Sequence, residues 1–318
     1  MITGGTGSFG YAFVKKILDL NLVEELIVYS RDELKQFEMQ SSLKSSQVRF
    51  VLGDVRDFSR LKQSLVGVDV VVHAAAMKQV PASENNPIEA IKTNIIGADN
   101  VINASNQVGV EKLIALSTDK AANPINLYGA TKLCSDKLMV AGNYLLQNSG
   151  TKISVVRYGN VLGSRGSVVP FFKEKSKSGL IPLTHPSMTR FWLTIEEGVQ
   201  FVLDSMSRMH GGEIFVPKIP SFKVIDVAKV IAPDAEIQII GVRPGEKIHE
   251  VMITEDDSFY TFEFDNYYVI LSPALMQSAF YLKYGRKVKS GFRFSSDSNE
   301  NWFTPEKFKL ILEDNNLL

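Results

Sequence analysis

Tyr128 and Lys132, four positions apart, are the pair in this sequence with the clearest capacity for chemistry. Residues i and i+4 share one face of a helix, so both side chains could reach the same substrate group. A free phenol has a pKa of about 10, and a nearby ammonium favours its ionised form. The spacing therefore predicts a tyrosine base with Lys132 lowering its pKa. The alternative is a surface tyrosine and lysine one helical turn apart.

A second polar pair, Asp119 and Lys120, lies nine positions before Tyr128. A simple dehydrogenase needs one base, so a further acid and base predict additional proton transfers. Adjacent side chains can share a proton, and their pKa values would then be coupled. The alternative is a polar pair at a strand end that caps the following turn.

Glycines with the spacing G-x-x-G-x-x-G, at Gly4, Gly7 and Gly10, open the chain before a helix-like apolar run. Such a loop lets backbone N–H groups approach a pyrophosphate, which the helix N-terminus also attracts. We expect the dinucleotide to contact Gly4, Thr6, Gly7, Ser8, Phe9 and Gly10.

Apolar segments of strand length follow the loop and alternate with helical stretches. They are 26–29, 48–52, 68–72 and 113–116. This alternation predicts an α/β fold with a Rossmann-type doubly wound parallel sheet. Only Met1 and Ile2 precede the glycine loop, whereas a central strand usually has about five or six residues. Most of the first strand is therefore expected to be missing, with native residues upstream of Met1.

Ser30, Arg31 and Lys35 follow the second expected strand and suit the 2′-phosphate of NADP. Asp32 in the same segment suits the ribose hydroxyls of NAD, and a solvated run of charges is the alternative to either site. Asp54 ends the third strand, where its carboxylate could accept a hydrogen bond from the adenine amino group or simply form a turn. We predict NADP.

The composition excludes several classes of protein. The chain has 318 residues, which is enough for a nucleotide-binding domain with a second lobe. Its net charge of zero gives no sign of a nucleic-acid surface. It has no membrane-length apolar run and no signal peptide, so a cytoplasmic protein is expected. The one cysteine, Cys134, is interpreted as a packing residue, and the four histidines show no metal-ligand spacing, so no metal is predicted.

Ten ordered motifs give the chain a resemblance to a known family. They are TGGTGSFG (3–10), YSRDELKQFEM (29–39), GDVRD (53–57), HAAAMKQVP (73–81), LSTDKA (116–121), NLYGATKL (126–133), RYGNVLGSRGSVVP (157–170), MTRFW (188–192), MHGGEIFVPKIP (209–220) and RPGEKIHE (243–250). Almost the whole chain resembles the extended short-chain dehydrogenases/reductases, which modify nucleotide sugars. Within that family it is similar to the soluble inverting 4,6-dehydratases of UDP-N-acetylglucosamine, which begin pseudaminic acid biosynthesis.

The resemblance separates this chain from two neighbouring groups. Retaining dehydratases carry Asp-Glu where this chain has Asp119-Lys120, and some membrane-anchored relatives carry methionine where it has Tyr128. It implies that UDP-N-acetylglucosamine is the substrate, that NADP is the cofactor, and that the protein is a homo-oligomer. The product would be UDP-2-acetamido-2,6-dideoxy-β-L-arabino-hex-4-ulose.

A role for each catalytic residue is also implied. Tyr128, with Lys132, would remove the C4 hydroxyl proton as hydride leaves C4, and Thr118 would hydrogen-bond O4. The C4 ketone acidifies the C5 proton. Lys120 would then take that proton, and Asp119 would protonate the departing C6 hydroxyl.

Binding residues outside the glycine loop are implied by the same resemblance. Further cofactor contacts are Val55, Ala74, Ala75, Lys78 and Asn94, together with Tyr128 and Lys132. Substrate contacts are Lys78, Thr118, Tyr128, Asn160, Arg243 and Glu246. Arg243 would meet the diphosphate and Glu246 the uridine ribose, whereas a surface salt bridge between these two is the alternative reading. Arg165 and Arg190 are weaker phosphate candidates.

Residues 1–162 are expected to form the NADP-binding domain and residues 163–318 mainly a substrate-binding lobe, with later segments returning to the first domain. The apolar positions from Phe191 to Met206 recur at helical spacing and predict core packing. A polar turn and a short amphipathic helix are expected between Asp297 and Leu318. A nucleotide-sugar 4-epimerase or 4-reductase remains an alternative function, and a non-catalytic dinucleotide-sensing regulator is an alternative of another class.

Overall fold

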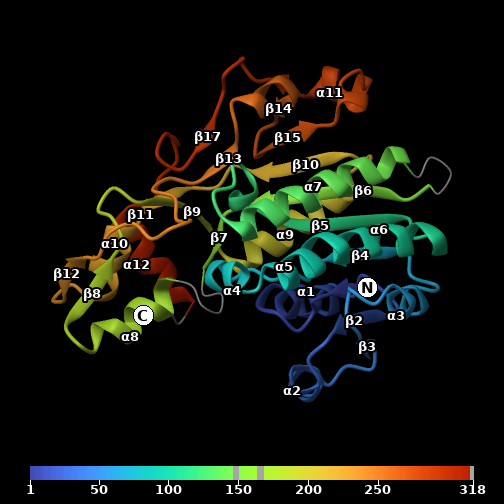
Figure 1. Cartoon of the computed structure of the whole chain (residues 1–318), viewed down its shortest axis with the longest axis horizontal. Coiled ribbons are helices and arrows are strands. Elements are labelled where there is room, and N and C mark those ends of the chain that lie inside the picture. Colours follow the sequence, from blue (N-terminus) through green and yellow to red (C-terminus); the bar gives the residue numbers. More distant parts are fainter. Residues whose placement is uncertain (146–149, 163–167, 316–318) are drawn as a thin grey trace.

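The structure is a computed structural model that describes residues 1–145, 150–162 and 168–315 (Figure 1). The helices are α1 (Ser8–Asp19), α2 (Glu33–Leu43), α3 (Phe58–Ser64), α4 (Val80–Asn85), α5 (Pro87–Ile91), α6 (Gly97–Val108), α7 (Leu127–Leu145), α8 (Val168–Ser176), α9 (Ile195–Arg208), α10 (Val224–Ile231), α11 (Ala279–Tyr284) and α12 (Pro305–Asp314). Short helical turns are the π-helix η1 (Lys92–Ile96) and the 3-10 turns η2 (Asp119–Ala121), η3 (Asp256–Tyr260) and η4 (Pro273–Leu275).

The strands are β1 (Ile2–Thr3), β2 (Leu26–Ser30), β3 (Val48–Leu52), β4 (Val70–His73), β5 (Lys112–Thr118), β6 (Lys152–Tyr158), β7 (Asn160–Val161), β8 (Leu180–Leu183), β9 (Thr189–Leu193), β10 (Glu213–Pro217), β11 (Ser221–Lys223), β12 (Glu236–Ile239), β13 (Val251–Ile253), β14 (Thr261–Glu263), β15 (Tyr267–Leu271), β16 (Arg286–Lys287) and β17 (Phe294–Ser295).

The main sheet has ten strands in the described part of the chain, in the order β16-β14-β15-β10-β6-β5-β4-β1-β2-β3. The strands from β3 to β10 in that order are all parallel to their neighbours, whereas β15, β14 and β16 extend the sheet in antiparallel pairs. Long apolar runs form the central strands because both faces of a parallel sheet are covered. The predicted α/β Rossmann-type fold is therefore confirmed.

The first strand is short and central. Ile2 pairs with Val28 of β2 on one side and Val72 of β4 on the other. The α-amino group of Met1 donates to the Val70 carbonyl at 2.7 Å, and burial lowers its pKa to about 5. The glycine loop thus starts directly from the middle of the sheet.

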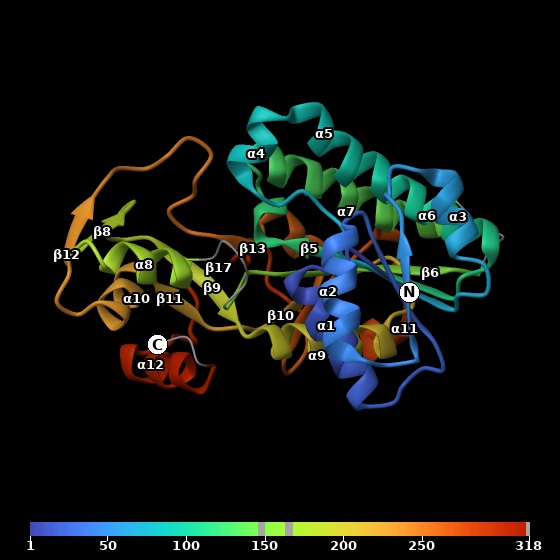
Figure 2. The ribbon, with the colours of Figure 1, turned by 90° about the horizontal axis from the view of Figure 1, so that it is seen from below.

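Helices cover both faces of the main sheet. Figure 2 shows the sheet between one layer with α3, α5, α6 and α7 and another with α1 and α9. The buried side chains of α1, among them Phe13, Val14 and Ile17, recur at helical spacing and explain why this segment is an amphipathic helix. Layers on both sides leave the strand ends as the place where loops can form a site.

A second core belongs to a smaller lobe built from α8, α10, α12, β8 and β12, at the left of Figure 1. Trp192 packs there against both Phe222 and Phe308, with ring centroids 4.5 and 4.4 Å away. The expected tail helix is confirmed as α12, which buries Phe308 and Leu312. Residues after 162 also return to the main sheet as β10, β14, β15 and β16, so the division at 162/163 stays a prediction, and the boundary borders residues outside those described.

The structure differs from one expected element. The segment from Phe191 to Met206 is split between β9, which buries Phe191, and α9, which contains Met206. A capping box starts α9, because the Thr194 side chain accepts from the Glu197 N–H while Glu197 accepts from the Thr194 N–H. The apolar positions belong to the core as predicted, but Phe191 reaches it from a strand.

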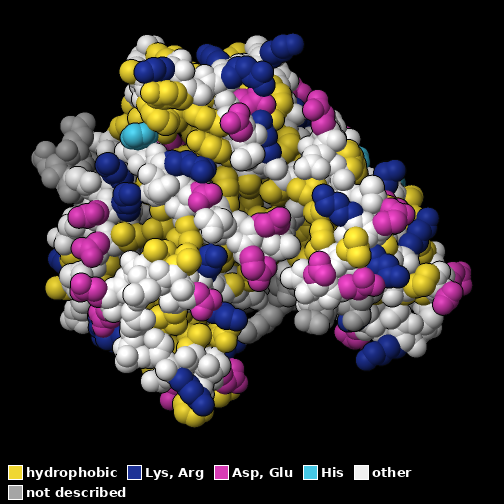
Figure 3. Space-filling view, turned by 180° about the vertical axis from the view of Figure 1, so that it is seen from behind, with side chains coloured by type: hydrophobic (Ala, Val, Ile, Leu, Met, Phe, Trp, Pro, Cys, Tyr) yellow, Lys and Arg dark blue, Asp and Glu magenta, His cyan; other side chains and the backbone are white. Residues whose placement is uncertain are grey.

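On the face in Figure 3, acidic and basic side chains are interspersed, in keeping with the zero net charge. No helix within the described residues has the length and apolar character needed to cross a membrane. No group of three or more His, Cys, Asp or Glu side chains in the same residues has the geometry to hold a metal ion.

Candidate active site

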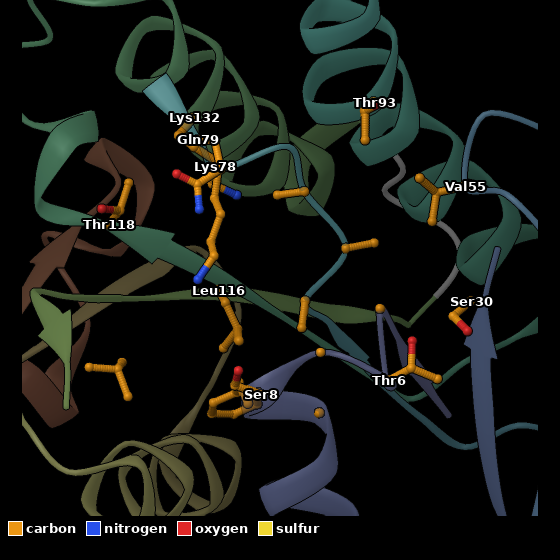
Figure 4. Close-up of a pocket in the computed structure, with 18 of the residues that line it drawn as sticks. Thr6, Ser8, Ser30, Val55, Lys78, Gln79, Thr93, Leu116, Thr118 and Lys132 are labelled. Atoms are coloured by element: carbon orange, nitrogen blue, oxygen red, sulfur yellow. The ribbon is translucent and has the colours of Figure 1, made fainter. Parts of the chain in front are cut away.

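A cavity of about 580 Å³ lies at the carboxyl ends of the parallel strands. Figure 4 shows Thr6 and Ser30 on one side and Thr118 and Lys132 on the other, with Ser8 and Leu116 between them. The predicted residues that line the cavity are Gly4, Thr6, Gly7, Ser8, Phe9, Gly10, Ser30, Arg31, Lys35, Asp54, Val55, Ala74, Ala75, Lys78, Thr118, Lys120, Tyr128, Lys132 and Asn160. The predicted residues that do not line it are Asn94, Asp119, Arg243 and Glu246.

The glycine loop forms one wall of the cavity. Gly4 has φ +68°, and a Cβ added there would lie 2.8 Å from Cα of Ala75. A Cβ at Gly10 would lie 2.3 Å from the Gly5 carbonyl oxygen, so the third glycine lets α1 pack against the loop. Helix α1 starts at Ser8 and points its N-terminus at the loop, where the first N–H groups of a helix lack intrahelical partners. This cradle fits a dinucleotide pyrophosphate.

The residues after β2 show why the sequence alone did not decide between NADP and NAD. Asp32 caps α2 by accepting from the Lys35 N–H, and it also pairs with the Lys35 ammonium at 2.5 Å. Arg31 lies 3.5 Å from Asp54, whose carboxylate also binds Arg56 at 2.6 Å. Burial favours the neutral form of Asp54, but these arginines lower its pKa overall. Three cations and two carboxylates therefore meet at this end of the cavity.

Tyr128 and Lys132 lie one turn apart on α7, and both are nearly fully buried, so the predicted shared face is confirmed. The predicted lowering of the tyrosine pKa is wrong for the protein alone. Burial raises the pKa of Tyr128 to about 12, opposed chiefly by the charge of Lys120 and a hydrogen bond with Thr118. Burial also lowers the pKa of Lys132, against the charge of Asp136.

Asn94 supports α7 from outside the cavity. Its side chain accepts from the Met77 N–H at 2.8 Å and donates to the Met77 carbonyl at 3.0 Å and to the Thr131 hydroxyl at 2.9 Å. It lies in the π-helix η1, a form often found at functional sites. Asn94 thus joins the loop after β4 to α7 beside Lys132, and direct contact with a cofactor stays a prediction.

The Asp119-Lys120 pair lies in η2, directly after β5. The Thr118 hydroxyl donates to Asp119 Oδ1 at 2.9 Å, and the Lys120 ammonium donates to the same oxygen at 3.0 Å. Asp119 is fully buried, and its Oδ2 has no hydrogen-bond partner in the described structure. Burial and the charge of Glu250 raise the pKa of Asp119 despite Lys120.

Glu250 is a residue that sequence reasoning missed. It precedes β13 and lies with its Oε1 3.4 Å from Lys120 Nζ and 3.7 Å from Arg190 Nε. Lys247 Nζ lies 3.8 Å from its Oε2. Burial would favour the neutral acid, but Lys120, Arg190 and Lys247 together lower the pKa of Glu250. No local pattern pointed to Glu250, because it lies 130 residues from Lys120 in the sequence.

The substrate candidates have separate environments. Asn160 lines the cavity, and its buried Oδ1 has no hydrogen-bond partner in the described structure, so it could accept from a ligand. Arg243 and Glu246 bind each other at 2.9 Å, with Arg243 two-thirds exposed. Arg190 donates to the carbonyls of Lys247 and Ile248, so its guanidinium holds the chain rather than facing the cavity. Arg165 lies outside the described residues.

Other lining residues were not predicted. They include Gln79, Thr93, Leu116, Ser117, Tyr158 and Ile195. Thr93 has a buried hydroxyl with no hydrogen-bond partner in the described residues, and Figure 4 places it with Val55 on the wall opposite Thr118. Tyr158 lies at the end of β6 and stacks on Phe9 with ring centroids 6.5 Å apart. The position of Tyr158, next to the end of an apolar strand, was the signal that could have identified it.

The parallel sheet, the glycine cradle and the buried Tyr-x-x-x-Lys pair are those of the extended short-chain dehydrogenase/reductase family, as the sequence predicted. Within that fold class, the chain belongs to the family described as polysaccharide biosynthesis protein, which it matches over residues 1–272.

Individual relatives are similar over most of their length. The chain is 56% identical over 322 residues to a Campylobacter jejuni subsp. jejuni (serotype O:23/36, strain 81-176) protein named UDP-N-acetylglucosamine 4,6-dehydratase (inverting), a match that covers 98% of this chain and 96% of that protein. It is 41% identical over 278 residues to a UDP-glucose 4-epimerase of Rickettsia conorii, covering 85% and 82%. The solved structure of Pen from Bacillus thuringiensis has a TM-score of 0.92 at 34% identity, covering 100% of this chain and 97% of that one.

Proposed function

We propose that this protein is a UDP-N-acetylglucosamine 4,6-dehydratase that inverts C5, the first step of pseudaminic acid biosynthesis. The observation that carries the proposal is that Tyr128, Lys132 and Lys120 line one cavity, while Asp119 lies behind its wall 3.0 Å from Lys120. These residues would form two separate proton-transfer pairs. Tyr128 and Lys132 supply one pair, and Lys120 with Asp119 supplies the other. The 56% identity to an inverting dehydratase supports the same function.

The cofactor we propose is NADP, held by the glycine loop and by Arg31 and Lys35. When bound, the dinucleotide supplies a hydride acceptor for the first step and a donor for the last. Its pyrophosphate would lie over Gly4 and the start of α1, and its 2′-phosphate would draw Arg31 from Asp54 and Lys35 from Asp32. Both ion pairs are at least partly exposed and cost little to rearrange.

The first chemical step is oxidation at C4. Tyr128 takes the O4 proton while hydride leaves C4, and the Thr118 hydroxyl would turn from Asp119 to donate a hydrogen bond to O4. Direct loss of the C6 hydroxyl from the unoxidised sugar would be slow, because its C5 proton is not acidic. A C4 ketone makes that proton removable.

The second step removes water from C5 and C6. Lys120 takes the C5 proton, and a proton from Asp119 leaves with the C6 hydroxyl as water. The raised pKa of Asp119 suits an acid, although its carboxyl lies below the cavity wall and must turn toward C6. The charges of Asp119 and Glu250 outweigh burial and raise the pKa of Lys120, so its ammonium must first release a proton to water in the cavity before it can take the C5 proton. Hydride then returns to C6, and protonation at C5 from the opposite face inverts that centre.

The remaining substrate contacts extend this proposal. Asn160, with its free buried acceptor, would bind the sugar or the diphosphate. Arg243 and Glu246 would open their mutual ion pair to bind the diphosphate and the uridine ribose. Lys78 extends across the cavity between Lys132 and Leu116, where it could meet both ligands (Figure 4).

The test is to incubate the purified protein with UDP-N-acetylglucosamine and NADP and to record the product mass. Loss of one water supports the dehydratase. An unchanged mass with a changed proton spectrum would instead favour a 4-epimerase, the second candidate, which the 41% identity to a UDP-glucose 4-epimerase supports. An epimerase would use Tyr128 and Lys132 but would leave Asp119 and Lys120 without a role. No turnover of any nucleotide sugar would favour a regulator.

A further inference from the structure

A buried group of five charged side chains lies behind the cavity wall. It comprises Asp119, Lys120, Arg190, Lys247 and Glu250, which come from η2, β9 and the segment before β13. Only Lys120 of this group lines the cavity. The charges of the other four therefore reach a ligand chiefly through Lys120.

The Lys120 ammonium lies between two carboxylates. Asp119 Oδ1 is 3.0 Å from it and Glu250 Oε1 is 3.4 Å from it. Each carboxylate also has a buried second oxygen, Asp119 Oδ2 and Glu250 Oε2, that has no hydrogen-bond partner in the described structure. A buried carboxylate oxygen without a hydrogen bond is costly, although Glu250 Oε2 has the Lys247 ammonium 3.8 Å away.

The chain fixes Glu250 in this position from several directions. Its N–H donates to the Ser296 hydroxyl at 2.9 Å, and its carbonyl accepts from the Ser296 N–H at 2.8 Å. Arg190 and Lys247 hold the preceding residues, since Arg190 donates to the Lys247 carbonyl and the Lys247 ammonium donates to the Ala122 carbonyl at 2.6 Å. Segment 247–250 is thus tied directly to η2.

We propose that Glu250 is a positioning residue that holds the Lys120 ammonium against Asp119 and sets the pH at which this pair exchanges protons with the sugar. This inference rests on the proposed dehydration and assigns Glu250 no contact with substrate. A carboxylate beside an ammonium favours the charged amine, whereas the same carboxylate beside Asp119 favours the protonated acid. Glu250 thereby favours the protonated form of both members of the pair.

The other groups that face Lys120 do not cancel this effect. Arg190 from β9 opposes it by disfavouring the charged amine, but its guanidinium is itself paired with Glu250. Lys247 acts in the same direction as Arg190 and lies on the far oxygen of Glu250. Tyr128 from α7 is neutral at ordinary pH in the protein alone, because burial raises its pKa to about 12.

Replacement of Glu250 by glutamine keeps the shape and removes the charge. Without that charge the Lys120 pKa falls, and the Asp119 pKa falls too, so both limbs of the pH profile for C5 proton exchange move to lower pH. An opposite charge this close shifts a pKa by roughly one to three units, and we expect a displacement of at least about one unit. A purely structural role for Glu250 would lower the rate without moving the profile.

Two measurements on the E250Q holoenzyme test the inference. The first is the titration of Lys120, followed by the ¹³Cε signal of labelled lysine and assigned by its loss in K120R. The second is the pH profile of deuterium incorporation at C5 of UDP-N-acetylglucosamine. The variant E250D, which keeps the charge, should return both values toward those of the wild type.

Glu263 provides a matched control, because its carboxylate also joins two cations, Lys218 at 2.8 Å and Arg286 at 2.5 Å, and none of the three lines the cavity. E263Q should change neither measurement. A Lys120 titration unchanged in E250Q overturns the proposal, and this result is independent of turnover. A shifted titration with an unshifted exchange profile also overturns it, because the coupling would then have no part in the reaction. Absence of wild-type exchange would refute the dehydratase, while the titration would still decide the Glu250–Lys120 coupling.

Discussion

Replacement of Tyr128 by phenylalanine removes the group that we propose takes the C4 hydroxyl proton. Tyr128 is nearly fully buried, and burial raises its pKa to about 12. At pH 7 its ionisation therefore costs about 7 kcal/mol, which is about five pH units at 1.36 kcal/mol each. One unit charge about 5 Å away supplies roughly 3 kcal/mol at an effective dielectric constant of about 20. Lys120 already acts on Tyr128, so the oxidised nicotinamide and Lys132 must supply the rest.

The expected result follows from these values. Loss of a positioned general base lowers kcat by about 10²- to 10⁴-fold. Loss of one hydrogen bond weakens substrate binding by only about 0.5–1.5 kcal/mol, so KM should change by less than about tenfold. In the wild type the first step should accelerate as pH rises from about 6 to about 8, because the ionised fraction of a group with a higher pKa grows tenfold per unit.

The assay follows loss of water by mass and reduced nicotinamide by absorbance in a single turnover. Tyr144→Phe is the matched control, because Tyr144 lies on the same helix and its hydroxyl meets Ser272 away from the cavity. That variant should keep wild-type turnover. Wild-type rates of C5 deuterium incorporation in Tyr128→Phe would refute the reasoning, since exchange would then not need prior oxidation at C4.

Three further substitutions test the fold and the cofactor site. Gly4→Ala should weaken dinucleotide binding about tenfold or more by calorimetry, because φ +68° and a Cβ 2.8 Å from a backbone atom strain the loop by roughly 1–3 kcal/mol; unchanged affinity would contradict the cradle. Asp136→Asn should lower the free energy of unfolding in urea by about 1.5–3 kcal/mol, because the buried Arg157 loses the nearer of its two carboxylate partners, at 3.2 Å, and keeps Asp257 at 3.6 Å; a loss below about 1 kcal/mol would contradict this assignment. Burial lowers the pKa of His73 to about 3, so as the pH falls below about 6.5 the unfolded chain binds a proton before the folded protein does. The free energy of unfolding therefore decreases as the pH falls, by about 2 kcal/mol at about pH 5. His73→Asn should remove that part of the pH dependence, and an unaltered slope would contradict the assignment.

Much of the main sheet could be predicted because its signals are local. The apolar runs at β2, β3, β4 and β5 were each located to within a few residues. The i, i+4 spacing of Tyr128 and Lys132 was enough to place both on one helical face. The spacing of the glycines was enough to predict the cradle, since the backbone geometry of this loop requires glycine.

The features that could not be predicted from the sequence depend on burial and on contacts between distant segments. The pKa of Tyr128 was predicted to fall, but desolvation by residues far apart in the chain raises it. Glu250 reaches Lys120 only because β13 and η2 fold together. From the sequence, Arg190 was a weaker candidate for a phosphate ligand, whereas in the fold its guanidinium donates to the carbonyls of Lys247 and Ile248. Long-range contacts of this kind produce no periodic pattern in the sequence.

The central claim is that a C4 ketone lets Lys120 and Asp119 remove water from C5 and C6. The most direct measurement is conversion of UDP-N-acetylglucosamine in heavy water, with the product examined by mass and proton spectra. The account predicts loss of one water, one solvent deuterium at C5 and an L configuration there. A dehydrated product that keeps its original C5 hydrogen, or a sugar that loses no water, would contradict it.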